Sequence, residues 1–279
     1  MLTGAAKIAG VMGWPVSHSL SPRLHGYWLR EYGIDGAYVP LAVLPEKITE
    51  AIRGLPALGF AGANVTIPHK EAAFAAMDET DAAATAMGAV NTIVVRQDGT
   101  LFGSNTDGYG FMESIRAELP DWRADQGPVL ILGAGGAARG IAVTLLGAGA
   151  NEIRLANRTQ KRADDLADLL GDAATAVTWE DRAGAVDGAA LVVNTTSLGM
   201  TGKEPLEIDL AGLDGDAIVY DIVYTPLETP LLAAARAKGN TGIDGLGMLL
   251  HQARPGFEAW FGIRPQVTAA QRDFVLGAK

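Results

Sequence analysis

The chain has 279 residues, of which 48% are hydrophobic and 19% charged, and it contains no cysteine. Its formal net charge of −10 argues against nucleic acid or an anionic membrane as a partner, because either would repel most of the protein surface. Without cysteine there are no disulfides and no thiolate chemistry, which fits a reducing compartment. We therefore expect a cytoplasmic protein that acts on small molecules.

Targeting segments and metal sites are not indicated. The N-terminal residues contain no basic region leading into a long apolar run, so we predict neither a signal peptide nor a transmembrane span. The four histidines show no zinc-ligand spacing, and we expect no metal.

Strand-like apolar runs alternate with helical patterns along the chain, which predicts an α/β fold with parallel sheets. The length suffices for two domains. In the first hundred or so residues, strands are expected over 7–13, 38–43, 62–67, 91–96 and 100–103. Asp98 and Gly99 separate the last two strands and indicate a hairpin turn.

A glycine-rich turn follows the apolar run at 129–132, which is typical of a buried parallel strand. The turn consists of Gly133, Ala134, Gly135, Gly136, Ala137 and Ala138. In a dinucleotide site Gly133 permits the bend, Gly135 lets the backbone approach the pyrophosphate, and Ala138 packs the next helix on the strand. The alternative is an ordinary tight turn.

The residues after the next strand, expected over 152–156, indicate which dinucleotide is bound. An NAD-binding chain would place an acidic residue there for the ribose 2′-hydroxyl. This chain instead carries Asn157, Arg158, Thr159 and Arg162. Guanidinium groups bind a 2′-phosphate bidentately, so we predict NADP(H). The alternative is a solvated basic face that pairs with Asp164, Asp165 and Asp168.

These elements predict two domains. A Rossmann-type NADP-binding domain is expected over 108–245, with later strands over 190–194 and 217–221. A substrate-binding domain is expected over 1–107, completed by C-terminal helices over 246–279. Because Arg254, Pro255 and Gly256 interrupt the apolar pattern of those helices, we predict that the helix carrying Gln252 ends or kinks there.

Short polar motifs recur from the first strand to the last helices. They are GWPVSHSLSPRLH at 13–25, NVTIPHK at 64–70, GAVNT at 88–92, GSNTDG at 103–108, the glycine turn, NRT at 157–159, NTTSLGM at 194–200, YDIVY at 220–224 and DGLGMLL at 244–250. Together they resemble the motifs of the shikimate dehydrogenase family, in the same order. One departure is Gly26, which follows His25 where the family often has asparagine, and it puts in doubt any contact made by that amide.

The resemblance implies a substrate site of hydroxyl and amide side chains. Ser19 and Ser21 match a pair of hydroxyls that hold a carboxylate, and a helix N-cap before Pro22 is the alternative. The positions that match contacts to the ring hydroxyls are Asn64, Thr66, Asn91 and Gln252, and Tyr224 matches a tyrosine near the substrate. Amides suit hydroxyls because they donate and accept at once. Each of these would otherwise be a structural polar residue.

Lys70 and Asp107 match the catalytic pair of the family. Adding hydride to a ketone leaves negative charge on oxygen, and a lysine supplies both a proton and a positive charge. The carboxylate would orient the ammonium, bind an adjacent substrate hydroxyl and help with proton movement, and the sequence leaves open which of the two groups transfers the proton. The alternative for such a pair is a surface ion pair of little energetic value.

On the cofactor side, Thr195, Thr196 and Ser197 follow a predicted strand, where loops of open α/β sheets meet ligand. The resemblance also assigns Gly245 to the cofactor site. It places Ile222 and Met248 against the nicotinamide, although both are equally typical of core residues.

The resemblance therefore implies an oxidoreductase of aromatic amino-acid biosynthesis, which reduces 3-dehydroshikimate to shikimate with NADPH. A homodimer is one assembly to test. A quinate/shikimate dehydrogenase is the nearest alternative. A non-catalytic sensor of NADP(H) or of a shikimate-like ligand is a second alternative, which the presence of both Lys70 and Asp107 disfavours.

Overall fold

The chain forms two compact units in the computed structural model, which describes residues 2–277. Unit 1 comprises Met1–Asp107 and Leu249–Lys279, and unit 2 comprises Gly108–Met248. The assignment of one unit to substrate and the other to cofactor stays a prediction. Among the described residues, no helix is both long and apolar enough to cross a membrane.

Unit 1 is built on a mixed six-stranded sheet with the order β2-β1-β3-β5-β6-β4. Its strands are β1 (Lys7–Gly13), β2 (Gly36–Ala42), β3 (Phe60–Val65), β4 (Glu79–Thr80), β5 (Thr92–Val95) and β6 (Leu101–Ser104). β1, β2 and β3 are parallel, as expected. β5 and β6 pair antiparallel, which confirms the predicted hairpin, and Gly99 in its turn has φ of 83°.

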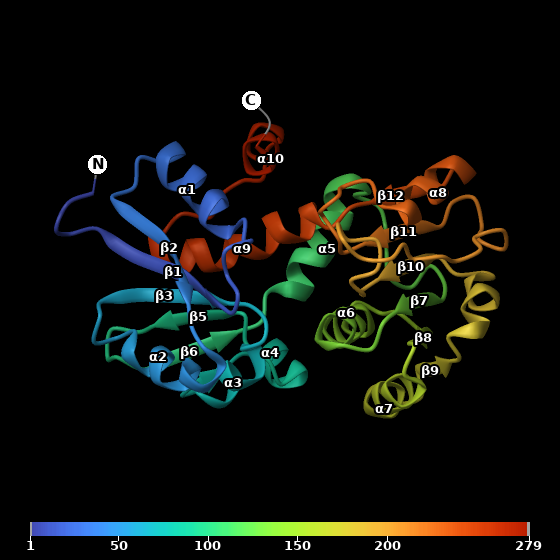
Figure 1. Cartoon of the computed structure of the whole chain (residues 1–279), viewed down its shortest axis with the longest axis horizontal. Coiled ribbons are helices and arrows are strands. Elements are labelled where there is room, and N and C mark those ends of the chain that lie inside the picture. Colours follow the sequence, from blue (N-terminus) through green and yellow to red (C-terminus); the bar gives the residue numbers. More distant parts are fainter. Residues whose placement is uncertain (1, 278–279) are drawn as a thin grey trace. The chain divides into compact units, whose positions relative to one another are not determined.

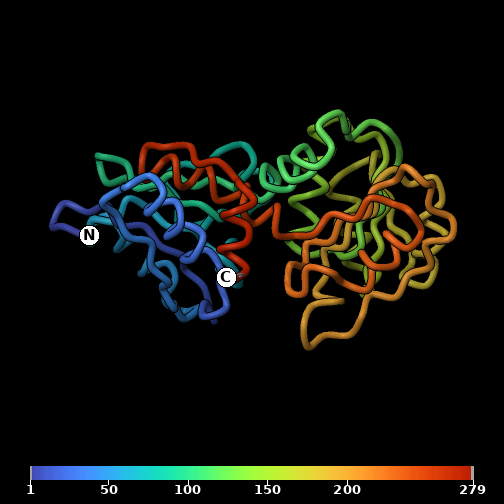
Figure 2. The backbone as a smooth tube through the Cα atoms, turned by 90° about the horizontal axis from the view of Figure 1, so that it is seen from above, coloured from blue at the N-terminus to red at the C-terminus, as the bar shows by residue number. Residues whose placement is uncertain are grey.

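The helices of unit 1 include two that come from the end of the chain (Figure 1). They are α1 (Ser21–Glu31), the short 3₁₀ helix η1 (Pro45–Lys47), α2 (Ile48–Gly54), α3 (Lys70–Ala75), α4 (Ala82–Met87), α9 (Leu246–Phe261) and α10 (Ala269–Leu276). Figure 2 shows the C-terminal segment returning to the N-terminal one, and the rings of Tyr27 on α1 and Phe274 on α10 lie 5.3 Å apart.

An aromatic cluster joins α1, β2 and α9. The His25 ring stacks on Tyr38 at 3.8 Å and lies within 6 Å of Trp28, Phe257 and Trp260. His25 is fully buried, and among the described residues neither of its ring nitrogens has a hydrogen-bond partner. Burial lowers the pKa of His25 from 6.5 to about 3, so the ring is neutral at physiological pH.

Of the two predicted outcomes at Pro255, an end of the helix carrying Gln252 is wrong, and a kink stays a prediction. α9 continues through Pro255 to Phe261. Proline removes one helical hydrogen bond, but Phe257 and Trp260 beyond it are buried, and Trp260 donates its indole N–H to the Ile93 carbonyl at 2.9 Å. Packing therefore outweighs the local cost of the proline.

Unit 2 contains a doubly wound parallel sheet with the order β12-β11-β10-β7-β8-β9. Its elements are α5 (Asp107–Glu118), β7 (Val129–Leu132), α6 (Gly136–Gly147), β8 (Ile153–Ala156), α7 (Gln160–Leu170), β9 (Ala174–Val177), the 3₁₀ helix η2 (Glu180–Val186), β10 (Leu191–Asn194), β11 (Ile218–Asp221), α8 (Pro230–Lys238) and β12 (Thr241–Ile243). The strand order reverses between β7 and β10, which is the switch point where ligands bind in such sheets.

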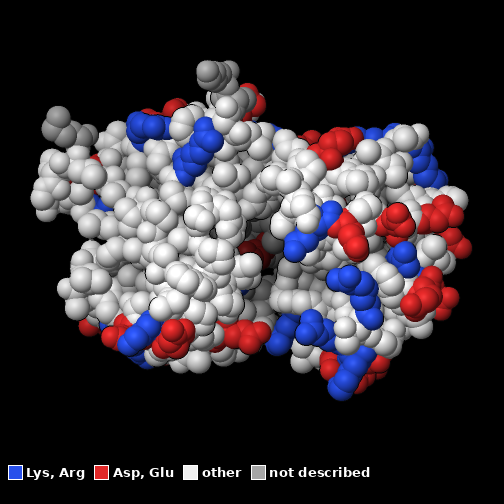
Figure 3. Space-filling view, viewed as in Figure 1, with Lys and Arg blue, Asp and Glu red and all other residues white. Residues whose placement is uncertain are grey.

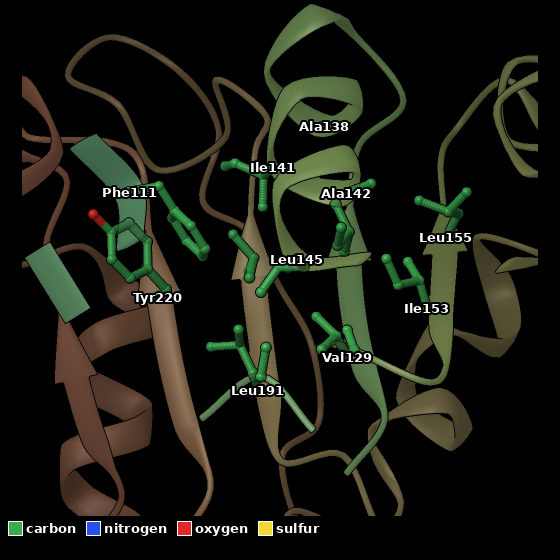
Figure 4. Close-up of a cluster of buried hydrophobic side chains, with 14 of the residues drawn as sticks. Phe111, Val129, Ala138, Ile141, Ala142, Leu145, Ile153, Leu155, Leu191 and Tyr220 are labelled. Carbon is green, nitrogen blue, oxygen red and sulfur yellow. The ribbon is translucent and has the colours of Figure 1, made fainter. Parts of the chain in front are cut away.

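Both faces of this sheet are buried, which explains why its strands are continuously apolar. Along β7, Val129 and Ile131 belong to a core shared with α5, α6 and α7, whereas Leu130 and Leu132 belong to one shared with η2 and α8. Figure 4 shows α6 side chains lying against the strands in the first core. The strand that leads into the glycine turn is thereby packed on both faces.

Replacing His25 with leucine should make the fold less sensitive to acid. Because the folded state holds His25 neutral, the unfolded chain binds the proton more tightly, and stability falls as pH drops below 6.5. From pH 7 to pH 5 this amounts to about 2 kcal/mol.

Urea unfolding followed by circular dichroism at the two pH values measures the difference. The exposed His18 provides the control, because His18→Leu leaves the buried imidazole of His25 in place. An equal loss of stability in His25→Leu and wild type would contradict the expectation.

Candidate active site

Lys70 and Asp107 are in direct contact within unit 1. Lys70 begins α3, Asp107 begins α5, and Lys70 Nζ lies 2.5 Å from Asp107 Oδ2. Their side chains are 28% and 22% exposed, whereas the surface pair Lys161 and Asp165 is 81% and 59% exposed. The contact is therefore not an ordinary surface ion pair, and it remains open enough to meet a ligand.

The Asn91 carboxamide holds the other side of the Asp107 carboxylate. Asn91 Nδ2 donates to Asp107 Oδ1 at 2.7 Å, while Asn91 Oδ1 accepts from the Thr106 backbone N–H at 2.9 Å. The Asn105 side chain accepts from the Asp107 N–H at 3.1 Å. Each carboxylate oxygen thus has one partner, and Asp107 is fixed relative to Lys70.

Gln252 reaches the same network from α9. Its Oε1 lies 3.5 Å from Asn91 Nδ2 and from Thr106 Oγ1, and its Nε2 donates to the Leu249 carbonyl at 3.1 Å. Because α9 continues through Pro255, Gln252 keeps a regular helical position.

Asn64 is buried and its amide is already used inside unit 1. Its Nδ2 donates to the Asn91 carbonyl and to Thr92 Oγ1, each at 3.1 Å, and its Oδ1 accepts from the Tyr38 hydroxyl at 2.6 Å. Burial raises the pKa of Tyr38 against the opposing effect of a hydrogen bond with Ser21. Asn64 therefore holds the backbone of Asn91 in place through a hydrogen bond to its carbonyl. The role of Tyr38 was missed, because a tyrosine on a strand looks like a core residue.

The two serines lie at the start of α1. Ser19 is partly exposed and its Oγ accepts from the Ser21 N–H at 3.3 Å, while Ser21 itself is buried. The N-cap of α1 is Leu20, with no side-chain cap. Neither serine is therefore the N-cap residue. Thr66 is partly exposed directly after β3.

The glycine turn in unit 2 depends on one close approach. Gly133 has φ of 113°, and a Cβ there would lie 2.4 Å from Thr195 Oγ1. Thr195 Oγ1 donates to the Leu132 carbonyl at 2.7 Å, which ties this loop to the end of β7. By contrast, a Cβ on Gly135 or Gly136 would meet no atom within 4 Å. Among the described residues, no side chain caps the α6 N-terminus.

Arg158 and Arg162 are exposed, and neither forms an ion pair with a described residue. Of the aspartates considered as their partners, Asp165 pairs with Lys161 at 2.7 Å and Asp164 accepts from Gln160. Asn157 donates to the Thr159 carbonyl at 2.9 Å. Figure 3 shows Lys and Arg side chains gathered on part of the visible face of unit 2, although the chain is acidic overall.

A buried pair, Asn194 and Asp221, shapes the loops after β10 and β11. Asn194 Nδ2 donates to Asp221 Oδ1 at 2.9 Å, and Asn194 Oδ1 accepts from the Thr196 N–H at 3.0 Å. Asp221 also accepts from the Val223 N–H and from the Thr229 hydroxyl that caps α8. Burial raises the pKa of Asp221. Both residues belong to motifs named in the sequence analysis, but their contact was not predicted, although two polar residues ending neighbouring apolar strands are a usable signal.

The remaining predicted cofactor residues lie near these loops. Ile222 and Met248 are partly buried against the unit 2 core. Gly245 has no room for a side chain, because a Cβ would lie 2.0 Å from the Ile222 carbonyl oxygen. Ser197 is exposed, and Tyr224 is partly buried, which raises its pKa.

The doubly wound sheet, its switch point and its glycine turn define an α/β protein of the Rossmann class. Three family models match the chain: "Shikimate dehydrogenase substrate binding domain" at 11–93, "Shikimate / quinate 5-dehydrogenase" at 116–201 and "Shikimate 5'-dehydrogenase C-terminal domain" at 245–271. The chain belongs to the shikimate dehydrogenase family.

Known proteins resemble the chain over nearly its whole length. Shikimate dehydrogenase (NADP(+)) of Paramagnetospirillum magneticum is 60% identical, covering 99% of this chain and 100% of the relative. The Thermus thermophilus shikimate 5-dehydrogenase complex with NADP(H) and shikimate has a TM-score of 0.86 at 35% identity, covering 98% and 100%. Quinate dehydrogenase of Corynebacterium glutamicum in complex with NAD has a TM-score of 0.90 at 32% identity, covering 98% and 99%.

Replacing Gly133 with alanine should destabilise unit 2, because the new Cβ would collide with Thr195 Oγ1 in a backbone conformation that side chains rarely adopt. The expected cost is roughly 1–3 kcal/mol. Thermal or urea unfolding measures it. Gly135→Ala is the matched control, since its Cβ enters open space. Equal stability of the two variants would show that the close approach is unimportant.

Proposed function

We propose that this protein is an NADP-dependent shikimate dehydrogenase, which reduces 3-dehydroshikimate to shikimate reversibly. The observation that carries the proposal is the contact of Lys70 with Asp107 inside a network fixed by Asn91. The 60% identity to a curated shikimate dehydrogenase supports the substrate and the cofactor. The proposed reaction belongs to aromatic amino-acid biosynthesis.

Lys70 is proposed as the proton donor to the carbonyl oxygen. When bound, NADPH supplies the hydride that forms the new C–H bond. The C=O electron pair moves onto oxygen, and the Lys70 ammonium both stabilises that charge and transfers a proton to form the hydroxyl. Asp107, 2.5 Å away, orients the ammonium and accepts a hydrogen bond from a neighbouring substrate hydroxyl. In the reverse reaction the same amine accepts the proton of the hydroxyl as hydride leaves the carbon.

Substrate binding is proposed for the polar side chains around this pair. Ser19 and Ser21 would bind the carboxylate, and the ring hydroxyls would contact Thr66, Asn91 and Gln252. Tyr224 is also proposed as a substrate contact. Because the Asn64 donors are already paired, we propose that Asn64 positions Asn91 and meets substrate only through a free lone pair on Oδ1.

The residues of unit 2 fit a dinucleotide phosphate. A Cβ on Gly135 or Gly136 would meet no atom within 4 Å, so there is room for a pyrophosphate at the α6 N-terminus, which has no side-chain cap among the described residues. Arg158 and Arg162, without ion-pair partners among the described residues, suit the 2′-phosphate. Thr195, Ser197, Ile222, Gly245 and Met248 remain proposed contacts to the rest of the cofactor.

A cytoplasmic location is proposed because the chain has no cysteine to oxidise. A homodimer is proposed as its assembly, and light scattering of the purified protein tests it.

Lys70→Ala should lower kcat by roughly 10²–10⁴-fold, because a proton donor and a charge are lost together. Affinity for NADP⁺ should not change. Initial rates of shikimate oxidation and calorimetric titration with NADP⁺ measure both. Lys47→Ala is the control, since Lys47 forms an exposed pair with Glu50. Turnover by Lys70→Ala at the wild-type rate would remove the catalytic assignment.

Arg158→Leu should weaken NADP⁺ binding by roughly ten- to hundredfold, because charge-assisted hydrogen bonds to the 2′-phosphate are lost. NAD⁺, which lacks that phosphate, should be affected much less. Titration with each nucleotide measures the ratio of the NADP⁺ and NAD⁺ affinities. Lys161→Leu, which removes an amine paired with Asp165, should leave it unchanged. If the ratio of the two affinities in Arg158→Leu equals the wild-type ratio, the 2′-phosphate binds elsewhere.

Parallel assays of the wild type with shikimate and quinate, each with NADP⁺ and NAD⁺, separate the alternative functions. Turnover of shikimate with NADP⁺ alone supports the proposal. Turnover of quinate or use of NAD⁺ indicates the quinate/shikimate alternative, to which the likeness with a quinate dehydrogenase draws attention. Binding of NADP⁺ without any turnover indicates a sensor.

A further inference from the structure

The Tyr38 hydroxyl lies at the buried end of the polar network that leads to Lys70 and Asp107. Tyr38, on β2, is 7% exposed, and its hydroxyl donates to Asn64 Oδ1 at 2.6 Å. Its ring stacks on the His25 imidazole with an angle of 1° between the two planes. A phenylalanine ring would stack there equally well, so packing alone does not account for the hydroxyl.

The direction of the hydrogen bonds in this network is set by two groups at its other end. A carboxylate can only accept, and a backbone N–H can only donate. Asn91 must therefore turn Nδ2 to Asp107, at 2.7 Å, and Oδ1 to the Thr106 N–H, at 2.9 Å. Thr92 Oγ1 donates to the same Oδ1 at 2.9 Å. The single hydrogen of Thr92 is then used, and its oxygen accepts from the next neighbour.

That neighbour is Asn64, which carries the same direction on to Tyr38. Its Nδ2 donates to Thr92 Oγ1 and to the Asn91 carbonyl, each at 3.1 Å. Since both of those oxygens accept, the Asn64 amide cannot turn over, and its Oδ1 is left facing the phenol. Tyr38 is thus held as a donor at the end of a series of hydrogen bonds that begins at Asp107.

Ser21 meets the Tyr38 hydroxyl from the first residue of α1. The two side chains share a hydrogen bond, and Ser21 is itself buried. Because the Tyr38 hydrogen goes to Asn64, the hydrogen of this second bond must come from Ser21. The substrate carboxylate, for which Ser21 is proposed above, needs the same hydrogen. Tyr38 and the carboxylate therefore compete for it.

Loss of the Tyr38 hydroxyl would act on the ion pair through these intermediates. Asn64 Oδ1 would be a buried acceptor without the donor that it now faces. A buried polar group that loses its donor shifts or admits water, because leaving it unsatisfied is costly. Either change loosens the Nδ2 bonds of Asn64 to Thr92 and to the Asn91 backbone. Asp107 would then be held less firmly against Lys70, and small displacements of reacting groups slow a reaction.

We propose that Tyr38 is a positioning residue for the reaction, whose hydroxyl fixes the Asn64 carboxamide and, through it, Asn91 and the Asp107 carboxylate. This inference rests on the proposed function. It gives β2, the strand at one edge of the unit 1 sheet, a part in the reaction through side chains that are buried.

Tyr38→Phe removes the hydroxyl and keeps the ring. We expect kcat for shikimate oxidation to fall roughly three- to tenfold, which is the rate equivalent of one net hydrogen bond. The KM for shikimate should not rise, because the Ser21 hydrogen is released for the carboxylate. Rates are divided by the number of NADP⁺ sites found by calorimetry, so that inactive protein is not counted. Tyr27→Phe is the control, since it removes a hydroxyl from a ring that packs against Phe274.

Two further variants show whether the effect passes through Asn64. In an Asn64→Ala background, Tyr38→Phe should change kcat by less than about twofold, because the contact that it breaks is already gone. A general loss of packing would lower kcat equally in both backgrounds. Tyr38→4-aminophenylalanine places an N–H donor on the same ring, and it should recover most of the wild-type kcat.

The outcomes separate this inference from the proposed function. If wild type oxidises shikimate, the positioning role is overturned by wild-type kcat in Tyr38→Phe, by an undiminished loss in the Asn64→Ala background, or by no recovery with 4-aminophenylalanine. A raised KM at wild-type kcat would make Tyr38 a substrate contact, which also overturns it. Failure of the wild-type protein to oxidise shikimate would overturn the proposed function, and this inference with it.

Discussion

The Asn91 carboxamide is the contact on which the polar network of unit 1 depends. Its oxygen accepts the Thr106 backbone N–H, and its nitrogen donates to the Asp107 carboxylate that pairs with Lys70. Only a group that donates and accepts can hold both the backbone before Asp107 and the carboxylate itself. A buried aspartate in its place would repel Asp107 and leave the ion pair without its second restraint.

Unit 2 solves a similar problem with Asn194 and Asp221. Each ends a buried strand, and together they hold the loops after β10 and β11 by hydrogen bonds to backbone N–H groups. In both units an asparagine is paired with an aspartate, although in unit 1 Asn91 precedes β5 and Asp107 begins α5. Irregular backbone carrying the proposed ligand contacts is thus fixed by buried polar groups that are themselves satisfied.

Local patterns predicted much of the fold. The apolar strands, the hairpin and the glycine turn all follow from short-range signals, and the structure has them near the expected residues. β9 was missed because its four residues are small and half-exposed at the sheet edge. The path of α9 through Pro255 could not be predicted, since the buried contacts that maintain it come from residues far away in the chain.

The candidate site was predictable to a similar degree. The contact of Lys70 with Asp107 matches the pairing inferred from motifs. The hydrogen bonds of the Asn64 amide with Tyr38 and Thr92 could not be predicted from the sequence, because they depend on which strands become neighbours.

The division of the chain into two units also has a consequence for folding during translation. Unit 2 is continuous in sequence, whereas unit 1 needs residues after 248. During translation unit 2 can fold as it leaves the ribosome, but the N-terminal sheet must wait for Phe257 and Trp260 before its core is closed, and until then it is exposed to chaperones and proteases.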